Sequence, residues 1–283
     1  MIMATIATRL TNTGNLLVNG TIDEFTGAPV IDSNTYVWLD AAQTTSYPGT
    51  GTSWTSLTSQ ANVATLYNGT AFNTNNGGYF TFDGTDDYAQ LTPPPNIGTC
   101  TVATVEMWAN IKATGSRMPF GFTSYDVYLS GGAMGFNTAN SDVYGITAAN
   151  VTTLGLVGNW NHYCYVMYNN VSLGGTTYSN NKIYVNGVSQ PLQQITGNIS
   201  STIRTIAGNL TIGGWTNNVA QYKPSMDSSV IKLYDRELTQ AEVLQNYNAL
   251  APRYGLTANT SGNTIQRTLS NTVLAAQFDE VTF

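Results

Sequence analysis

The stretch GNWNHYCYVMY, residues 158–168, decides the fold class of this chain. Its second half alternates by position: Tyr163, Tyr165 and Met167 fall on one side, and Cys164, Val166 and Tyr168 fall on the other. Successive side chains of a β-strand point to opposite faces of its sheet. Aromatic and β-branched residues are also the ones that strands favour. The stretch therefore predicts a β-strand.

The same signal recurs in short segments on both sides of this strand. They are TYVWLD (35–40), GGYFTFDG (77–84), YAQLT (88–92), TVATVEMWANI (101–111), KIYVNG (182–187), NLTIGG (209–214) and SSVIKLYD (228–235). Turn dipeptides with the positive φ that hairpins need lie at Gly77-Gly78, Asp83-Gly84, Asn186-Gly187 and Gly213-Gly214. Many short antiparallel strands without helices between them predict an all-β fold, a two-sheet antiparallel jelly-roll sandwich.

One short C-terminal helix is expected in LTQAEVLQNYNAL, residues 238–250. Thr239 and Glu242 have the spacing of a capping box, and Leu238 and Val243 that of a hydrophobic staple. The helix would present one apolar stripe, formed by Val243, Leu244, Tyr247 and Leu250, and Pro252 would end it. Such a helix, placed after the last strand, is expected to cover one side of the sandwich.

Composition excludes several classes of function. Only 9% of the 283 residues are charged, and 10 Lys and Arg against 16 Asp and Glu give a net charge of −6. No basic cluster is present to neutralise phosphates, so no nucleic-acid partner is expected. No apolar run reaches the roughly 20 residues of a membrane span, and no secretory signal is expected at the start of the chain. Cys100 and Cys164 are expected to be buried free thiols, although their pairing stays open.

The order of these segments resembles the laminin-G-like branch of the concanavalin A-like lectin/glucanase superfamily. The segments are WLDA (38–41), FDGTDDY (82–88), TVEMW (104–108), GNWNHYCYVMY (158–168), KIYVNGV (182–188), LTIGGW (210–215) and VIKLYDRELTQAEVLQNYN (230–248). The resemblance covers residues 36–250 and implies a two-sheet jelly roll, in agreement with the strand pattern. Domains of this branch with short extensions at both ends are similar to those of structural proteins of tailed bacteriophages.

The segments outside the resemblance echo each other: TIDEFTG (21–27) and QFDEVTF (277–283) each place Asp-Glu after an apolar residue. We therefore expect a strand-forming N-terminal arm (1–35), the jelly-roll domain (36–250) and a strand-forming C-terminal arm (251–283). Assembly contacts are assigned to Arg9, Leu17, Ile22, Asp23, Glu24, Phe25, Arg267, Leu274, Phe278, Asp279, Glu280 and Val281. The arms would pair with each other, or, as we favour, add to sheet edges of neighbouring copies; two unstructured tails of similar composition are the third alternative.

A glycoside hydrolase is the remote alternative that the superfamily suggests. Such an enzyme needs two carboxyl groups facing one cleft. The matching strand holds only Glu106, with Thr, Trp and Asn at positions 104, 108 and 110. His162 is the only histidine, so no multi-histidine zinc site is expected, and it is interpreted as a structural residue. No catalytic residue and no enzyme activity are expected.

Two further candidate sites compete with structural interpretations. Asp83, Asp86 and Asp87 in FDGTDDY are weak calcium candidates, but carboxylates that cap a turn are the favoured interpretation, and no metal or other cofactor is expected. Trp54, in the loop GTGTSWTSL, is the one tryptophan outside the segments that the family buries. It is the candidate for stacking on a sugar ring.

Together these observations predict a non-enzymatic phage virion protein, either a capsid decoration or cement protein or a tail or fibre component. Its partners would be other virion proteins and copies of itself, in a homo-oligomer. A lectin module that binds cell-surface glycans is the alternative.

Overall fold

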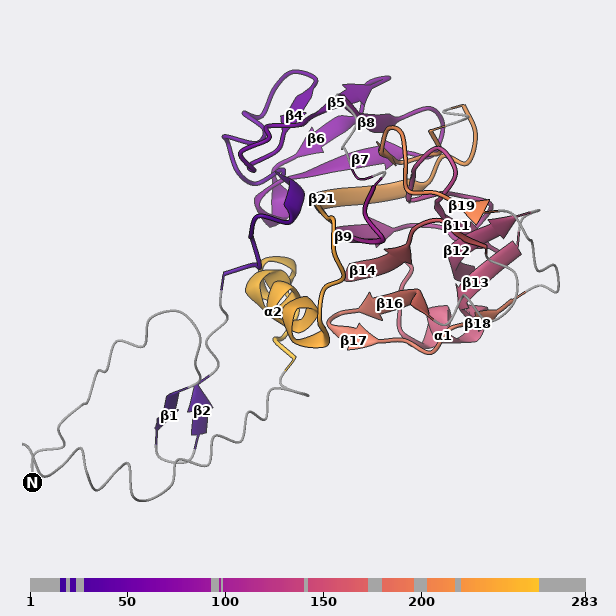
Figure 1. Cartoon of the computed structure of the whole chain (residues 1–283). Coiled ribbons are helices and arrows are strands. Elements are labelled where there is room, and N and C mark those ends of the chain that lie inside the picture. The colour runs from indigo at the N-terminus through magenta and orange to yellow at the C-terminus, as the bar shows by residue number, and fades with distance from the viewer. Residues whose placement is uncertain are drawn as a thin grey trace, which may run out of the picture.

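The computed structural model describes residues 16–18, 21–23, 28–92, 97, 99–139, 142–172, 180–195, 203–216 and 220–259. Two layers of β-sheet pack face to face (Figure 1). The first layer, called the large sheet here, has the order β17 (Val188–Ser189), β16 (Lys182–Val185), β14 (Trp160–Tyr168), β9 (Val102–Ile111), β21 (Ser225–Tyr234), β7 (Tyr79–Asp83) and β6 (Ala71–Asn73), and β3 (Thr35–Asp40) also pairs with β21.

The second layer consists of two smaller sheets. One has the order β10 (Phe120–Gly121), β20 (Thr211–Ile212), β8 (Tyr88–Thr92), β5 (Val63–Tyr67) and β4 (Ser53–Thr55). The other has the order β11 (Val127–Ser130), β12 (Ala133–Ala139), β13 (Asp142–Ile146) and β18 (Gln193–Gln194). Bridge pairs Arg117–Leu129 and Gly121–Asp126 connect the two. Every strand pair in the described residues is antiparallel, which confirms the all-β sandwich expected from the sequence.

The remaining elements are short. They are the strand pairs β1 (Leu16–Val18) with β2 (Thr21–Asp23) and β15 (Val171–Ser172) with β19 (Ile203–Arg204), the α-helices α1 (Ala148–Thr153) and α2 (Gln240–Leu250), and the 3₁₀ helices η1 (Asn75–Gly77) and η3 (Ala251–Tyr254).

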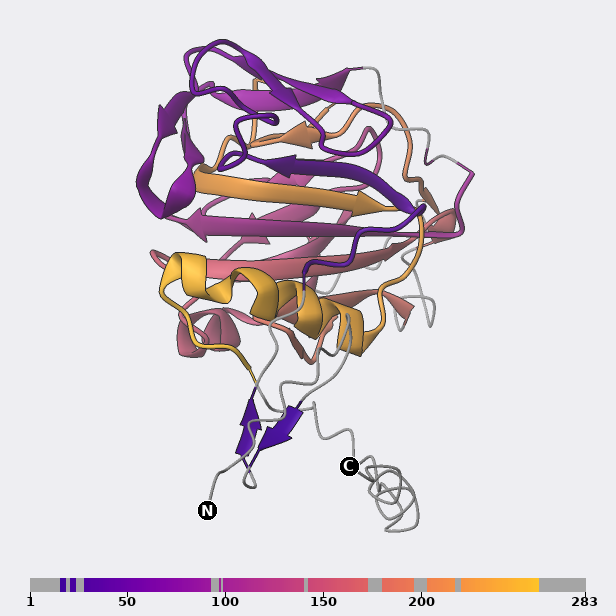
Figure 2. The same cartoon turned by 90° about the vertical axis from the view of Figure 1, so that its left-hand side faces the viewer.

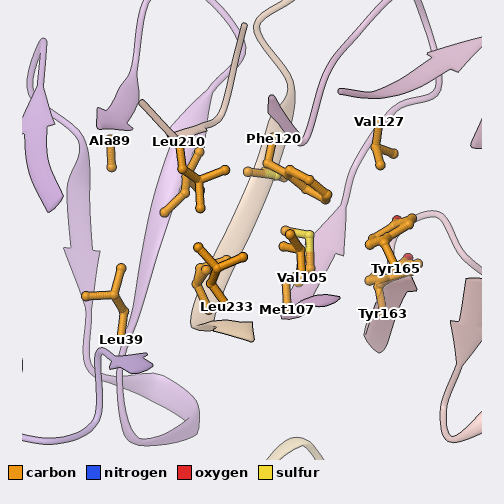
Figure 3. Packing of buried hydrophobic residues seen from close by; sticks show 14 of the residues in the cluster. Leu39, Ala89, Val105, Met107, Phe120, Val127, Tyr163, Tyr165, Leu210 and Leu233 are labelled. Atoms are coloured by element: carbon orange, nitrogen blue, oxygen red, sulfur yellow. The ribbon is translucent and has the colours of Figure 1, made fainter. Parts of the chain in front are cut away.

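Strand β14 confirms the alternation that defined the fold class. Tyr163, Tyr165 and Met167 join the core between the two layers, whereas Cys164 and Val166 lie on the opposite face of the large sheet. Figure 3 shows Tyr163 and Tyr165 beside residues from neighbouring strands and from the second layer. Both faces of the central strands are therefore covered, which is why these strands are apolar on both sides.

Helix α2 covers the outer face of the large sheet (Figure 2). Leu244 and Tyr247 pack there with Trp108 and Val230, and Val243 packs with Cys164. The Trp108 ring lies 4.2 Å from the Tyr254 ring and 5.8 Å from the Tyr247 ring, both nearly parallel to it. The stripe expected from the sequence is thus the buried side of the helix, and the α-helix ends at Leu250, before Pro252.

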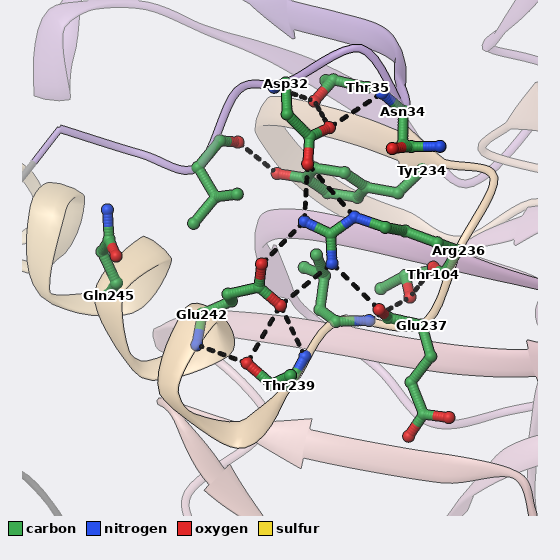
Figure 4. Close-up of polar contacts among 12 residues, drawn as sticks. Asp32, Asn34, Thr35, Thr104, Tyr234, Arg236, Glu237, Thr239, Glu242 and Gln245 are labelled. Carbon is green, nitrogen blue, oxygen red and sulfur yellow. Dashed lines mark hydrogen bonds and ion pairs between the residues drawn. The ribbon is translucent and has the colours of Figure 1, made fainter.

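The first turn of α2 holds the expected capping box. Thr239 accepts a hydrogen bond from the Glu242 amide at 3.3 Å, and the Glu242 carboxylate accepts one from the Thr239 amide at 2.8 Å. Arg236 also binds Glu242 at 2.7 Å and reaches Asp32 at 2.7 Å (Figure 4). This guanidinium ties the start of the helix to the segment that enters β3.

Residues outside the expected domain limits, 36 and 250, also contact α2. Before β3, the Val30 amide donates to Asn246 at 2.6 Å. After α2, Tyr247 donates to the Thr257 carbonyl at 2.8 Å, and Asn248 accepts from the Asn259 amide at 2.7 Å. These residues satisfy polar groups of the helix, and such contacts cannot be read from a pattern of strands in the sequence.

Only part of the first expected arm is described. Leu17 lies on β1, and Ile22 and Asp23 lie on β2; the two strands pair in register as Leu16–Asp23, Leu17–Ile22 and Val18–Thr21. The other residues assigned to assembly lie outside the described residues: Arg9, Glu24, Phe25, Arg267, Leu274, Phe278, Asp279, Glu280 and Val281.

Candidate functional site

The acidic turn Asp83–Asp87 follows strand β7. The Asp83 carboxylate accepts hydrogen bonds from the amides of Thr85 at 2.7 Å and Asp86 at 3.3 Å, and Asp87 accepts one from the Asp83 amide at 3.1 Å. The Thr85 hydrogen bond is the main cause of the lowered pKa of Asp83, whereas burial raises the pKa of Asp87. One ligand oxygen from each of Asp83, Asp86 and Asp87 lies within 4.8 Å of the others. The carboxylates cap the turn and are also close enough together to share a cation.

A lysine lies beside this turn. Lys223 is 3% exposed, and its ammonium lies 3.9 Å from the centre of the Tyr88 ring and 3.4 Å from the Gly213 carbonyl oxygen. Burial lowers the pKa of Lys223 to about 8, although the charges of Asp86, Asp87 and Asp83 act in the opposite direction. The protein thus provides its own positive charge next to the three carboxylates.

Chelator treatment is therefore expected to leave the melting temperature unchanged within error. The turn has its own hydrogen bonds and a neighbouring ammonium, so folding has no need of calcium at this place. Differential scanning calorimetry with and without EDTA measures this. A decrease of more than about 5 °C, or a rise of similar size on adding calcium, would contradict it, because a ligand that binds only the folded state stabilises it.

Glu106 does not face a cleft. Its side chain has no exposed surface, and its carboxylate lies under α2 with Lys232 at 2.9 Å, Asn246 at 2.6 Å and the His162 Nε2 atom at 3.1 Å. Burial alone raises the pKa of this carboxyl, but the Lys232 charge and then His162 outweigh it and hold the pKa at about 2. A carboxylate without solvent access cannot reach a glycosidic bond, so Glu106 is not the acid or nucleophile of a glycosidase.

His162 is fully buried on β14. Its ring lies 5.2 Å from the Trp108 ring and 6.0 Å from the Tyr247 ring. A histidine packed among aromatic rings under a helix agrees with the structural interpretation. Cys164 is a buried free thiol; Cys100 is also free, is half-buried, and donates to the Ile97 carbonyl at 2.8 Å.

Trp54, the candidate for stacking on a sugar ring, is buried. Trp54 lies on β4 and has no exposed surface; its ring centre is 4.8 Å from that of Phe80 in the core. It therefore offers no ring face to a sugar. The loop-like residues around it concealed a short strand, in which the alternation places Trp54 toward the core and Ser53 toward solvent.

A pair of tyrosines that the sequence did not single out lies on the outer face of the second layer. Tyr67 and Tyr88 are cross-strand partners on β5 and β8, and their rings stack at 4.5 Å with an angle of 11°. Because Leu66 and Ala89 point into the core, these two rings point outward. Gln90 extends the same face and donates to Thr211 at 3.1 Å. Both tyrosines are half-buried, and the Lys223 ammonium lies over the Tyr88 ring. An aromatic ring edge beside the Gln90 amide is what this face offers to a ligand with apolar faces and many hydroxyls.

The burial of Asp126 predicts a pH effect on stability in the mildly acidic range. Both carboxylate oxygens are buried and accept no hydrogen bond of good geometry. Burial raises the pKa of Asp126 to about 6, although Asn137 and the Arg204 charge oppose this. Between its unfolded and folded pKa values the group binds more protons when folded, so stability is lost as the pH rises from about 4 to about 6.

The Asp126→Asn variant should lack this loss. We expect its free energy of unfolding to match that of the wild type near pH 4 and to be larger by about 2 kcal/mol at pH 7. This is somewhat less than the free energy that corresponds to the full difference between the folded and unfolded pKa values. Urea titrations of both proteins across this range measure the difference. A constant difference at all pH values would show that Asp126 does not titrate as inferred.

A laminin G family model, described as the concanavalin A-like lectin/glucanases superfamily, matches residues 83–244, more than half of the chain. The chain therefore belongs to this superfamily. A search of curated proteins finds no match. Within the described residues, no helix is long and apolar enough to cross a membrane.

The similar solved structures include receptor-binding domains of botulinum neurotoxins. That of the C/D mosaic serotype has a TM-score of 0.53 at 10% identity, covering 80% of this chain and 55% of its own length. The serotype D ligand binding domain in complex with N-acetylneuraminic acid has a TM-score of 0.52 at 10% identity, covering 79% and 54%. This chain thus spans little more than half the length of these neighbours. At such identities the likeness shows a shared lectin-like fold.

Proposed function

We propose that this chain is a non-enzymatic virion structural protein of a tailed bacteriophage that displays a lectin-like domain, as a capsid decoration protein or as part of a tail or fibre. The residues that border the two flanking segments carry the proposal. Ala28, before β3, and Asn259, after η3, both contact α2. Gln245 donates to the Ala28 carbonyl at 2.7 Å, and Asn248 accepts from the Asn259 amide at 2.7 Å.

The residues that border both flanking segments thus lie at the helix that covers the large sheet. The second layer lies on the opposite side and presents the Tyr67–Tyr88 pair. An attachment side and a display side are what a surface-decorating module requires. Only 9% of the residues are charged, and a surface with so few charges suits a protein that is packed against neighbours.

A deletion of residues 1–27 and 260–283 tests the attachment. It spares the contacts of Ala28 and Asn259, so we expect a folded monomer with the thermal transition of the full chain. Light scattering should show the full chain, but not the trimmed one, as a homo-oligomer, and only the full chain should co-sediment with particles. If the trimmed protein keeps the oligomeric state and still decorates particles, the terminal segments are not the attachment device.

A second candidate function, glycan binding, is favoured by the outward-facing tyrosine pair. Lectin-like neighbours include a toxin domain in complex with N-acetylneuraminic acid, and we propose that this chain binds a cell-surface glycan on the Tyr67–Tyr88 face. A glycan array of the wild type, the Tyr67→Ala/Tyr88→Ala variant and a Gln60→Ala control in an exposed loop tests it. Binding lost only in the tyrosine variant supports this site; no binding, or equal binding by all three proteins, overturns it.

A further inference from the structure

Three buried side chains meet beneath α2: Lys232 from β21, Glu106 from β9 and Asn246 from the helix. None has any exposed surface. The Lys232 ammonium donates to Oε1 of Glu106 at 2.9 Å, and the Asn246 amide donates to Oε2 of the same carboxylate at 2.6 Å. One carboxylate thus holds an amine and a primary amide side by side.

The amide carbonyl of Asn246 is also bound. Its Oδ1 accepts a hydrogen bond from the Val30 amide at 2.6 Å, and its Nδ2 donates a second bond to the Tyr234 hydroxyl at 3.1 Å. A backbone N–H on a carbonyl oxygen withdraws electron density from the carbon and stabilises negative charge that develops on the oxygen. Asn246 is therefore arranged as an electrophile.

The surroundings are closed and, apart from the His162 ring at 3.1 Å from Glu106 and the Tyr234 hydroxyl, apolar. Leu244 and Trp108 belong to one buried cluster, and Val243 and Cys164 to another, on the same outer face of the large sheet. A buried ion pair in such a place carries a large desolvation cost. A reaction that neutralises both Lys232 and Glu106 removes this desolvation cost.

The geometry points to an intramolecular isopeptide bond between Lys232 and Asn246, with Glu106 as the proton carrier. A proton passes from Nζ to Glu106, and the neutral amine attacks Cγ of Asn246. The new Nζ–Cγ bond gives a tetrahedral centre whose oxygen is held by the Val30 amide. Glu106 passes its proton to Nδ2 and takes the remaining extra proton from Nζ. The Cγ–Nδ2 bond then breaks, and the products are the isopeptide, ammonia and a protonated, neutral Glu106.

The bond would join strand β21 covalently to helix α2, which leads through η3 toward the C-terminal flanking segment. Pulling on that segment would then load a covalent link in place of the packing of α2 alone. No oxidant, metal or added reagent is needed, because positioning of the three groups supplies the catalysis.

Mass spectrometry of the purified full-length protein tests the bond. Release of ammonia lowers the intact mass by about 17 Da. Trypsin should then fail to cut after Lys232, and the peptide ending at Arg236 should appear joined to the peptide of residues 237–253. Glu106→Gln, Lys232→Arg and Asn246→Ala should each restore the sequence mass, while Asn248→Ala on the same helix should keep the loss.

The wild-type protein decides the question even if a variant fails to fold. After overnight incubation, a wild-type chain at its full sequence mass that is cut after Lys232 overturns the proposal. Loss of ammonia without the joined peptide also overturns it, since succinimide formation at Asn186-Gly187 has the same mass change. If the joined peptide persists in Glu106→Gln, the bond forms without Glu106, and the proposed proton-carrying role of Glu106 is wrong.

Discussion

The Leu244→Asp variant is expected to be unfolded or aggregated at 25 °C. Leu244 is 2% exposed and packs with Trp108, Val230 and Tyr247 on the outer face of the large sheet. An aspartate there would bury an unpaired carboxylate, which costs several kcal/mol, comparable with the whole stability of a domain. Loss of the cooperative thermal transition by circular dichroism measures this result.

The matched control lies one turn earlier on the same helix. Ala241 is exposed in the first turn, where a negative charge interacts favourably with the helix dipole. Ala241→Asp should therefore melt within about 2 °C of the wild type. Similar melting of Leu244→Asp and Ala241→Asp would mean that α2 does not pack against the sheet through Leu244.

The Arg253→Ala variant is expected to lose about 3–5 kcal/mol of unfolding free energy, the usual effect of removing one partner of a buried ion pair. Arg253 lies on η3 and holds both carboxylate oxygens of Asp40, at 2.8 and 3.1 Å. The same guanidinium donates to the Ser229 hydroxyl at 2.8 Å and the Asn76 carbonyl at 2.7 Å. Without it, Asp40 stays buried with its charge unpaired.

Urea titration of three variants separates the causes. Arg253→Lys keeps a charge but loses the planar fork, so it should fall between the wild type and Arg253→Ala. Arg117→Ala removes a guanidinium that, among the described residues, donates to the carbonyl of its neighbour Ser116 in an exposed position, and should change stability by less than about 0.5 kcal/mol. A loss below about 1 kcal/mol in Arg253→Ala would show that η3 is not fastened through Asp40.

Local patterns in the sequence predicted much of the fold. The two faces of β14, the capping box of α2 and the turn at Asn186-Gly187, where φ is +49° and +78°, all agree with the structure. Each depends on residues within a few positions of one another. The same patterns failed for Trp54, because three residues of strand inside a polar loop are too few to show alternation.

The candidate sites depended on contacts that no local pattern contains. Tyr67 and Tyr88 stack only because β5 and β8 pair in one register. Lys223 lies beside the acidic turn although more than a hundred residues separate them. A shift of the β5–β8 register by one residue would turn Tyr67 or Tyr88 to the other face of the sheet.

By itself the sequence determined an antiparallel sandwich, a capped helix that closes it, and a low-charge surface, since alternation, capping and composition are properties of neighbouring residues or of the whole chain. Only the tertiary structure decided which polar groups are buried together. The register of β9 with β21 sets Glu106 opposite Lys232, and packing of α2 brings Asn246 onto the same carboxylate. Their meeting follows from the packing of the large sheet and its helix, because burial forces polar groups distant in sequence to satisfy one another.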